Sequence, residues 1–488
     1  MKRLGTRGVV RGAAALCFAM GTAVMSAQAQ GAESKAPDAA AVRVLLVSDI
    51  HFEPFWDPAK VARLKAAPVS QWKAILEKPD AADREGKFAE LQQTCHARGE
   101  DTSEALLDSS VTAINAQAAD VKFVMVSGDL MAHAFNCKYA TLFPKTLPGE
   151  YRAFAEKTLN YVTSRLREAL PGVPVYAALG NNDSDCGDYQ LDANGRFLKA
   201  EANEFTRGFS PADRPAAEQT FAAGGYYSVK LPTPMERARL LVLDDVFFSK
   251  KYATCGGNTD AAESETQIAW LEKELVDARK IHEKVWVMAH IPPGVDPYST
   301  AAKGPALCAG KPATMFLSSE ALPEALAKYG DVIRLAVFAH THMDEVRWLA
   351  PAGENAGQGV AVKMVPSISP INGNLPAFTV ATIDAQTAVV KDYRVIAASN
   401  KTGADATWAE EYDFAEAYKE PEFSAATVKD LIGQLESDRA AQTDASQNYI
   451  RSYDVGQPVR ELGPLWPAYV CALKNDTGAA FTKCLCGE

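Results

Sequence analysis

Carboxylate, imidazole and amide side chains follow five short apolar segments of this chain, and together they form a mixed nitrogen and oxygen donor set suited to zinc, iron or manganese. The pairs 49/51 and 340/342 have i, i+2 spacing, which places both side chains on one side of an extended segment. One such residue alone is more often a turn, a cap or a structural histidine, but the repeated pattern predicts a metal site. The candidate metal ligands are Asp49, His51, Asp129, Asn181, His290, His340 and His342.

The pentapeptide LGNND at 179–183 contains one of these ligands and raises a second question. Asn181 offers an amide oxygen to a metal. The next position is one from which a histidine could supply a proton, but Asn182 stands there and cannot act as an acid. The sequence therefore indicates metal binding at Asn181 and a changed catalytic role at Asn182.

The segments that carry these residues alternate with amphipathic helices. Buried strands are predicted at 42–49, 121–129, 173–180, 284–290 and 333–340, and helices at 102–119, 151–170 and 264–280. Loops at the carboxyl ends of such strands converge on one crevice, so residues far apart in the sequence can form one site. This pattern predicts a layered α/β fold.

The second half of the chain changes in character. Strand patterns at 346–350, 359–368, 377–384 and 388–396 follow one another without helices, and from about residue 406 the pattern is helical and polar. We therefore predict a catalytic domain over 42–400 and a C-terminal helical region over 401–488.

The N-terminus has the features of a secretory signal. Residues 1–29 combine a basic start, a short apolar stretch and the small-residue pattern Ala27-Gln28-Ala29, and residues 30–41 read as a flexible leader. Eight cysteines remain after residue 29, an even number that favours disulfides in an exported chain, with the pairing left open. Three of them lie near the C-terminus, which predicts that disulfides attach this end to the rest of the fold. We expect a periplasmic or secreted protein without an integral membrane segment after cleavage.

The charge of the chain excludes some partners. The net charge is −11, and removal of the signal takes away Lys2, Arg3, Arg7 and Arg11 and no acid, which leaves −15. Nucleic acid and anionic membranes are therefore not expected partners through bulk electrostatics. An anionic substrate would need the local charge of a metal.

The order Asp-x-His, Gly-Asp, Gly-Asn, His and His-x-His resembles the calcineurin-like metallophosphoesterase family over residues 42–395. The segments "SDIHFEPFWDP", "GDLMAH", "AHIPPGVD" and "HTHMDEV" resemble acid-sphingomyelinase-like phosphodiesterases. The resemblance implies an α/β/β/α-type sandwich and two divalent cations, zinc first, with manganese or iron as alternatives. It also implies that Asp129 bridges the cations, with the remaining ligands divided into two sets: Asp49, His51 and His342; and Asn181, His290 and His340.

Two positions depart from the family pattern. Ala339 replaces a glycine before His-x-His, and Asn182 replaces a histidine that helps protonate the leaving oxygen. Asn182 retains an amide that can hydrogen-bond a phosphoryl oxygen. His133, four residues after Asp129, matches a histidine that acid-sphingomyelinase-like enzymes place beside the phosphate. We therefore predict His133 as a proton donor or phosphate ligand.

These features predict an exported hydrolase of a small-molecule or lipid-derived phosphodiester. The GNND form is similar to that of endopolyphosphatases, so hydrolysis of polyphosphate or nucleotide anhydrides is an alternative. A metal-holding binding protein with little catalysis is a third. Residues 370–376 are a weaker candidate for the pocket rim, and the basic segment 249–257 could meet an anionic substrate. The aromatic residues that could border a lipid or a base are Phe55, Trp56, Tyr298 and Trp348.

Overall fold

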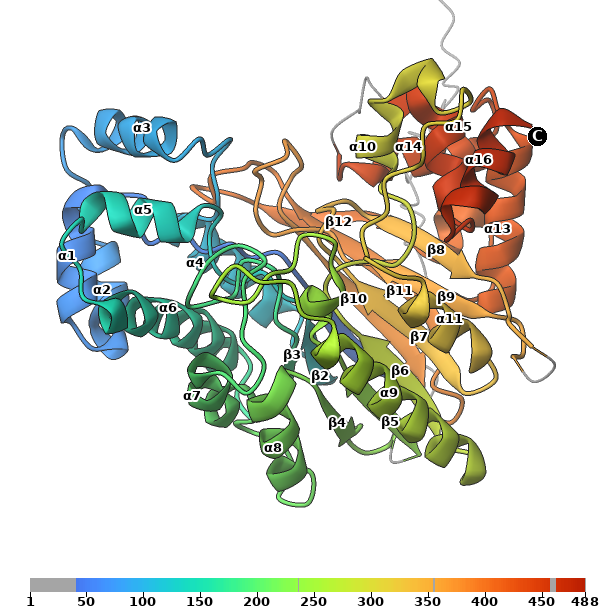
Figure 1. Cartoon of the computed structure of the whole chain (residues 1–488), viewed down its shortest axis with the longest axis horizontal. Coiled ribbons are helices and arrows are strands. Elements are labelled where there is room, and N and C mark those ends of the chain that lie inside the picture. Colours follow the sequence, from blue (N-terminus) through green and yellow to red (C-terminus); the bar gives the residue numbers. More distant parts are fainter. Residues whose placement is uncertain (1–40, 236, 354–355, 457–461, 488) are drawn as a thin grey trace, which may run out of the picture. The chain divides into compact units, whose positions relative to one another are not determined.

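The computed structural model describes residues 41–487 except 236, 354–355 and 457–461. The predicted signal peptide and all but the last residue of the predicted leader lie outside the described residues. From Ala41 onward, the described chain forms one compact unit, with two six-stranded sheets at its centre and helices on the outside (Figure 1).

The first sheet has the strand order β12-β11-β10-β1-β2-β3. β1 pairs in parallel with β2 and antiparallel with β10, and β2 pairs in parallel with β3. Residues 44–47 of β1 are almost completely buried, as expected of a strand covered on both faces. The strands are β1 Ala41–Val47, β2 Val121–Val126, β3 Val175–Ala177, β10 Ala377–Asp384, β11 Val390–Ala398 and β12 Trp408–Asp413.

The second sheet has the order β4-β5-β6-β7-β9-β8, with parallel pairing from β5 through β9. The two sheets pack against each other: Phe123 of β2 meets Trp286 of β6 with ring centroids 6.0 Å apart. This confirms the predicted layered α/β fold. The strands are β4 Tyr227–Lys230, β5 Ala238–Val242, β6 Lys284–Met288, β7 Ile333–Phe338, β8 Glu345–Leu349 and β9 Val360–Met364.

The outer helices follow the predicted amphipathic patterns. The predicted helix at 102–119 is α4, which begins after Ser103, whose hydroxyl accepts the Leu106 N–H at 3.3 Å. The helices of the first two thirds of the chain are α1 Pro58–Ala66, α2 Trp72–Leu76, α3 Arg84–Thr94, α4 Glu104–Ala116, α5 Phe135–Leu142, α6 Pro148–Ala169, α7 Arg196–Phe205, α8 Arg214–Gly224, α9 Ala262–Lys280, α10 Pro297–Ala301 and α11 Ala321–Lys328. Short 3₁₀ turns lie at Val69–Gln71, Asp245–Phe248 and Gly304–Ala306.

The C-terminal region is helical, as predicted, but its helices begin later than the pattern indicates. Residues 408–413 were expected to be helical and instead form β12, which pairs antiparallel with β11. The alternation of Trp408 and Tyr412 with charged residues fits the exposed edge of a sheet. The helices that follow are α12 Phe414–Tyr418, α13 Ala425–Ser437, α14 Asp444–Tyr453, α15 Leu462–Ala472 and α16 Gly478–Cys486. The boundary at residue 400 between a catalytic domain and a C-terminal region stays a prediction.

All eight cysteines after residue 29 are paired. The disulfides are Cys95–Cys137, Cys186–Cys255, Cys308–Cys486 and Cys471–Cys484. The last two link α16 to Cys308 and to α15, so the predicted attachment of the C-terminus by disulfides is present. Among the described residues, no helix combines the length and apolar character needed to cross a membrane.

Candidate metal centre

The predicted ligands lie in loops at the carboxyl ends of β1, β2, β3, β6 and β7. These loops have an unusual backbone: Asp49, His51, Asp129, His340 and His342 all have positive φ values, from 44° to 71°. Non-glycine residues rarely adopt this conformation, and it persists only where the surroundings enforce it. The fold therefore holds these five residues in strained positions, which is typical of functional sites.

One group of donors surrounds Asp49. His51 Nε2 lies 3.7 Å from Asp49 Oδ1, and His342 Nε2 lies 3.5 Å from the same oxygen. The two imidazole nitrogens are 3.2 Å apart. All three side chains are buried. Three donor atoms thus converge on one small volume.

A second group lies next to the first and is linked to it by Asp129. Asp129 Oδ2 lies 3.4 Å from His51 Nε2 and 3.2 Å from His290 Nε2. His340 Nδ1 lies 3.3 Å from His290 Nε2. Asp129 therefore stands between the two groups, as a bridging carboxylate must.

The two asparagines of LGNND have different partners. Asn181 donates its Nδ2 hydrogen to Asp188 Oδ1 at 2.7 Å, while its own Oδ1 is buried without a hydrogen-bond partner. Asn182 donates both its backbone N–H (2.8 Å) and its Nδ2 hydrogen (2.9 Å) to the Asp129 carboxylate. Asn182 thus contacts the carboxylate that links the two groups.

Hydrogen bonds behind the centre fix the imidazole orientations. His51 Nδ1 lies 2.9 Å from the Met131 carbonyl oxygen, and His290 Nδ1 lies 2.7 Å from that of Ser127. If Nδ1 donates to the carbonyl in each ring, Nε2 is left free of a proton and faces the centre. Such backbone contacts are common for metal-binding histidines.

Two carboxylates that the sequence analysis missed hold the loops together. Asp183 accepts the N–H groups of Leu130, Met131 and Gly180 at 2.8 to 3.0 Å, and so joins the β2 and β3 loops. Asp245 accepts the N–H group of His290 at 3.2 Å. Two sequence features could have marked these residues: Asp183 directly follows GNN, and Asp245 ends an apolar strand.

The electrostatics of the centre favour positive charge between the carboxylates. Burial alone would lower the pKa of His51 and His290, but the Asp129 carboxylate outweighs it, and the pKa values rise to about 9 and about 10. Burial lowers the pKa of His340 and His342 to about 3. The carboxylates thus attract positive charge, which a bound cation would supply in place of the extra ring protons of His51 and His290, while the imidazoles of His340 and His342 are already neutral.

The donor atoms fit divalent cations. Both Asp49 oxygens and Asn181 Oδ1 are buried without a hydrogen-bond partner, a state that costs free energy unless a ligand satisfies them. Two His/Asp groups have donor atoms within 4.8 Å of one another: Asp49, His51 and Asp129; and Asp129, His290 and His340. Imidazole nitrogens combined with carboxylate oxygens suit zinc, manganese and iron.

His133 lies beside these groups and differs from them in exposure. Its ring stacks on that of His51 with centroids 4.0 Å apart, and its side chain is 35% exposed. Asp101 holds it: the His133 backbone N–H donates to Asp101 Oδ2 at 2.9 Å, and ring Nδ1 lies 3.1 Å from Oδ1. No sequence pattern selects Asp101, which reads as a loop residue before a helix.

A pocket of about 410 Å³ opens beside His340. Its walls come from the 296–316 segment, from Asn372 in the predicted rim segment, and from α14 and α15, so the C-terminal helices help to form it. Among the described lining residues none is a lysine or an arginine. The lining includes three carboxylates and four aromatic rings, those of Asp296, Glu345, Asp454, Tyr298, Phe316, Tyr453 and Tyr469.

Close approach at Gly180 yields a first prediction. A Cβ atom at Gly180 would lie 2.2 Å from Asp129 Oδ1 and 2.4 Å from the Asp129 nitrogen. We expect Gly180→Ala to lower the free energy of unfolding by about 1–3 kcal/mol through overpacking, and to weaken metal binding by displacing Asp129. Denaturant unfolding and metal analysis check this.

Gly433→Ala is the control, since nothing lies within 4 Å of its added Cβ in α13. It should stabilise the protein by about 0.5–1 kcal/mol, because alanine favours a helix interior. Equal metal affinity and stability in Gly180→Ala and the wild type would contradict the predicted crowding.

The fold and the site together define a metal-dependent hydrolase of phosphoric esters. Residues 42–344 match the calcineurin-like phosphoesterase family, and the chain belongs to that family.

Individual relatives confirm the predicted resemblance to the acid-sphingomyelinase-like group. The chain is 26% identical over 403 residues to acid sphingomyelinase-like phosphodiesterase 3b of Homo sapiens, covering 79% of this chain and 80% of that protein. It is 24% identical over 399 residues to the cyclic GMP-AMP phosphodiesterase SMPDL3A of Bos taurus, with the same coverage. A solved structure of a dimetal phosphatase from Danio rerio has 12% identity and a TM-score of 0.39, covering 76% of this chain and 99% of that chain.

Proposed function

We propose that this protein is an exported hydrolase of phosphodiesters that works with two divalent cations. The observation that carries the proposal is the position of Asp129, whose carboxylate contacts a histidine of each donor group. The names of the relatives support a phosphodiester as the substrate. Four disulfides and the signal-like residues 1–29 support export.

In this proposal one cation would be bound by Asp49, His51, Asp129 and His342, and the other by Asp129, Asn181, His290 and His340. Zinc is the first choice, with manganese or iron as alternatives. Bound cations of this kind supply Lewis acidity, orient the phosphoryl group and make water a nucleophile near neutral pH. The protein contributes a buried, preformed set of donors.

His133 is proposed to bind the phosphate or protonate the leaving oxygen. Asp101 accepts a hydrogen bond from ring Nδ1, so Nε2 faces away from Asp101 and, in the imidazolium form of the ring, can donate a hydrogen bond or a proton to the substrate. The exposed fraction of the side chain makes it reachable, in contrast to the buried ligands. This assigns to His133 the task that Asn182 cannot perform, while Asn182 holds the Asp129 carboxylate.

The pocket beside His340 favours a phosphodiester over an anhydride. Glu345 Oε1 and Asp454 Oδ1 are buried without a hydrogen-bond partner, and the second Glu345 oxygen lies 3.2 Å from Arg347 Nη2. Charged carboxylates repel a chain of phosphates, whereas aromatic rings with carboxylates suit a neutral or cationic alcohol group. Burial raises the pKa of Asp454 to about 7, so its part in this repulsion is complete only above neutral pH. Hydrolysis of polyphosphate or nucleotide anhydrides stays the alternative, because Asn182 removes an acid that alkoxide leaving groups need most.

A substrate panel tests this choice. With two equivalents of zinc or manganese, we expect kcat/KM for phosphodiesters with an ammonium-bearing alcohol to exceed that for long-chain polyphosphate by about tenfold or more, because like charges oppose polyphosphate in the pocket. The panel compares a glycerophosphodiester with a choline group, sphingomyelin, ATP and polyphosphate. Asp454→Asn should reduce the difference.

Other outcomes of the panel are equally informative. Faster turnover of polyphosphate or ATP would support the anhydride hydrolase instead. Two bound cations with no hydrolysis of any compound, including bis-p-nitrophenyl phosphate, would support the metal-holding binding protein.

A further inference from the structure

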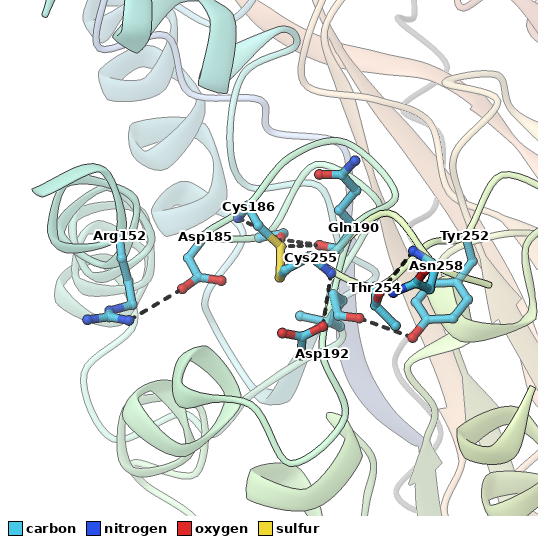
Figure 2. The surroundings of a disulfide bond; sticks show 11 residues. Arg152, Asp185, Cys186, Gln190, Asp192, Tyr252, Thr254, Cys255 and Asn258 are labelled. Atoms are coloured by element: carbon cyan, nitrogen blue, oxygen red, sulfur yellow. Dashed lines mark hydrogen bonds and ion pairs between the residues drawn. A yellow bond between two sulfur atoms is a disulfide. The ribbon is translucent and has the colours of Figure 1, made fainter. Parts of the chain in front are cut away.

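Two loop segments near the centre are joined by the Cys186–Cys255 disulfide (Figure 2). The first, residues 185–191, follows β3 and the LGNND loop; the second, residues 249–255, lies within the basic segment 249–257. Their backbones also pair: the Ala253 N–H donates to the Tyr189 carbonyl oxygen at 3.0 Å, and the Leu191 N–H donates to that of Ala253 at 3.1 Å.

Two adjacent residues of the first segment contact two ligands proposed for the same cation. Asp188 Oδ1 accepts the Nδ2 hydrogen of Asn181 at 2.7 Å, which fixes the amide and leaves its Oδ1 as the free donor atom. The Tyr189 hydroxyl lies 3.2 Å from His340 Nε2, so that Nδ1 of this ring faces His290. The Tyr189 N–H also donates to the Asn181 carbonyl oxygen at 2.9 Å.

The backbone at Tyr189 needs support to hold this arrangement. Its φ is 56°, a left-handed value that a bulky aromatic residue rarely adopts. The supports are the disulfide three residues earlier, the pairing with residue 253, and Lys251, whose Nζ lies 4.7 Å from the centroid of the Tyr189 ring and 3.4 Å from its hydroxyl.

We propose that Asp188 and Tyr189, anchored by the Cys186–Cys255 disulfide, are positioning residues for the cation bound by Asp129, Asn181, His290 and His340. The inference rests on the proposed two-cation function and adds residues to it. The other cation has separate supports, since His51 is oriented by the Met131 carbonyl. The disulfide therefore controls the occupancy of one cation more than that of the other.

Zinc titration against a chromophoric chelator, with metal analysis of the purified protein, tests the inference. The variants are Tyr189→Phe, Asp188→Ala and the double variant Cys186→Ser/Cys255→Ser. We expect each to bind one zinc as the wild type does and the second about 10- to 100-fold more weakly, the usual effect of removing a partner of a metal ligand.

The matched control is Cys471→Ser/Cys484→Ser, which removes a disulfide between α15 and α16. It should bind two zinc ions with wild-type affinities, and its melting temperature shows how much a lost disulfide alone destabilises the fold.

The outcomes separate this inference from the function on which it rests. A wild-type protein that binds fewer than two cations overturns the two-cation centre and the inference with it. A wild type with two cations, and variants that bind both with unchanged affinity, overturns the inference alone. Equal weakening of both cations in the three variants also overturns it, because the effect would then be global.

Discussion

Asp129→Asn is expected to reduce the rate of phosphodiester hydrolysis by about 10³-fold or more, since both cations would lose a shared anionic ligand. Asp129 is buried, and its carboxylate contacts His51 and His290 from the two donor groups. The amide has nearly the same size but no negative charge, so it cannot offset the repulsion between two cations. Metal analysis should find fewer than two ions per chain.

The control for this charge change is Asp277→Asn. Asp277 lies on α9, and its exposed carboxylate pairs with Lys273 and Lys280. Exposed ion pairs contribute little, so this variant should keep wild-type activity and metal content. An Asp129→Asn protein with two tightly bound ions and wild-type turnover would show that Asp129 does not link the two donor groups functionally.

His133→Ala is expected to lower kcat by about 10²–10⁴-fold for substrates with an alkoxide leaving group, the usual contribution of general acid catalysis. The loss should be much smaller for bis-p-nitrophenyl phosphate, because p-nitrophenolate departs without protonation. The number of bound cations should stay at two. Comparison of the two substrates distinguishes an acid from a residue that only stabilises the fold.

Two results would contradict this role. His133 also has a ring nitrogen within 4.8 Å of those of His51 and His342. Loss of a cation in His133→Ala would therefore make His133 a metal ligand. An equal loss of rate with both leaving groups would make it a phosphate ligand without acid function. The control is His282→Asn, which replaces an exposed histidine after α9. It should change neither the rates of hydrolysis nor the number of bound cations.

Much of the fold follows from local patterns that the sequence displays directly. Apolar runs such as residues 42–47 and 333–338 become strands because their side chains are buried on both faces. The polar residues that end these runs meet because parallel strands direct their carboxyl ends to one edge. This rule was sufficient to predict that Asp49, Asp129 and His290 would lie close together.

Other features depend on contacts that no local pattern encodes. Residues 408–413 form a strand because β11 offers an unpaired edge, and that edge overrides their helical composition. Asp101 and Tyr189 look like ordinary loop residues until the fold brings them to His133 and His340. The disulfide pairing was open for the same reason, because only the tertiary structure decides which cysteines approach each other.

A titration of the metal-free protein shows whether two cations held by the seven ligands hydrolyse a phosphodiester. Zinc or manganese is added in steps, and hydrolysis of bis-p-nitrophenyl phosphate is followed together with the number of ions bound. We predict that the rate rises to a plateau at two ions per chain. A plateau at one ion, or two bound ions without hydrolysis, would contradict a two-cation phosphodiesterase.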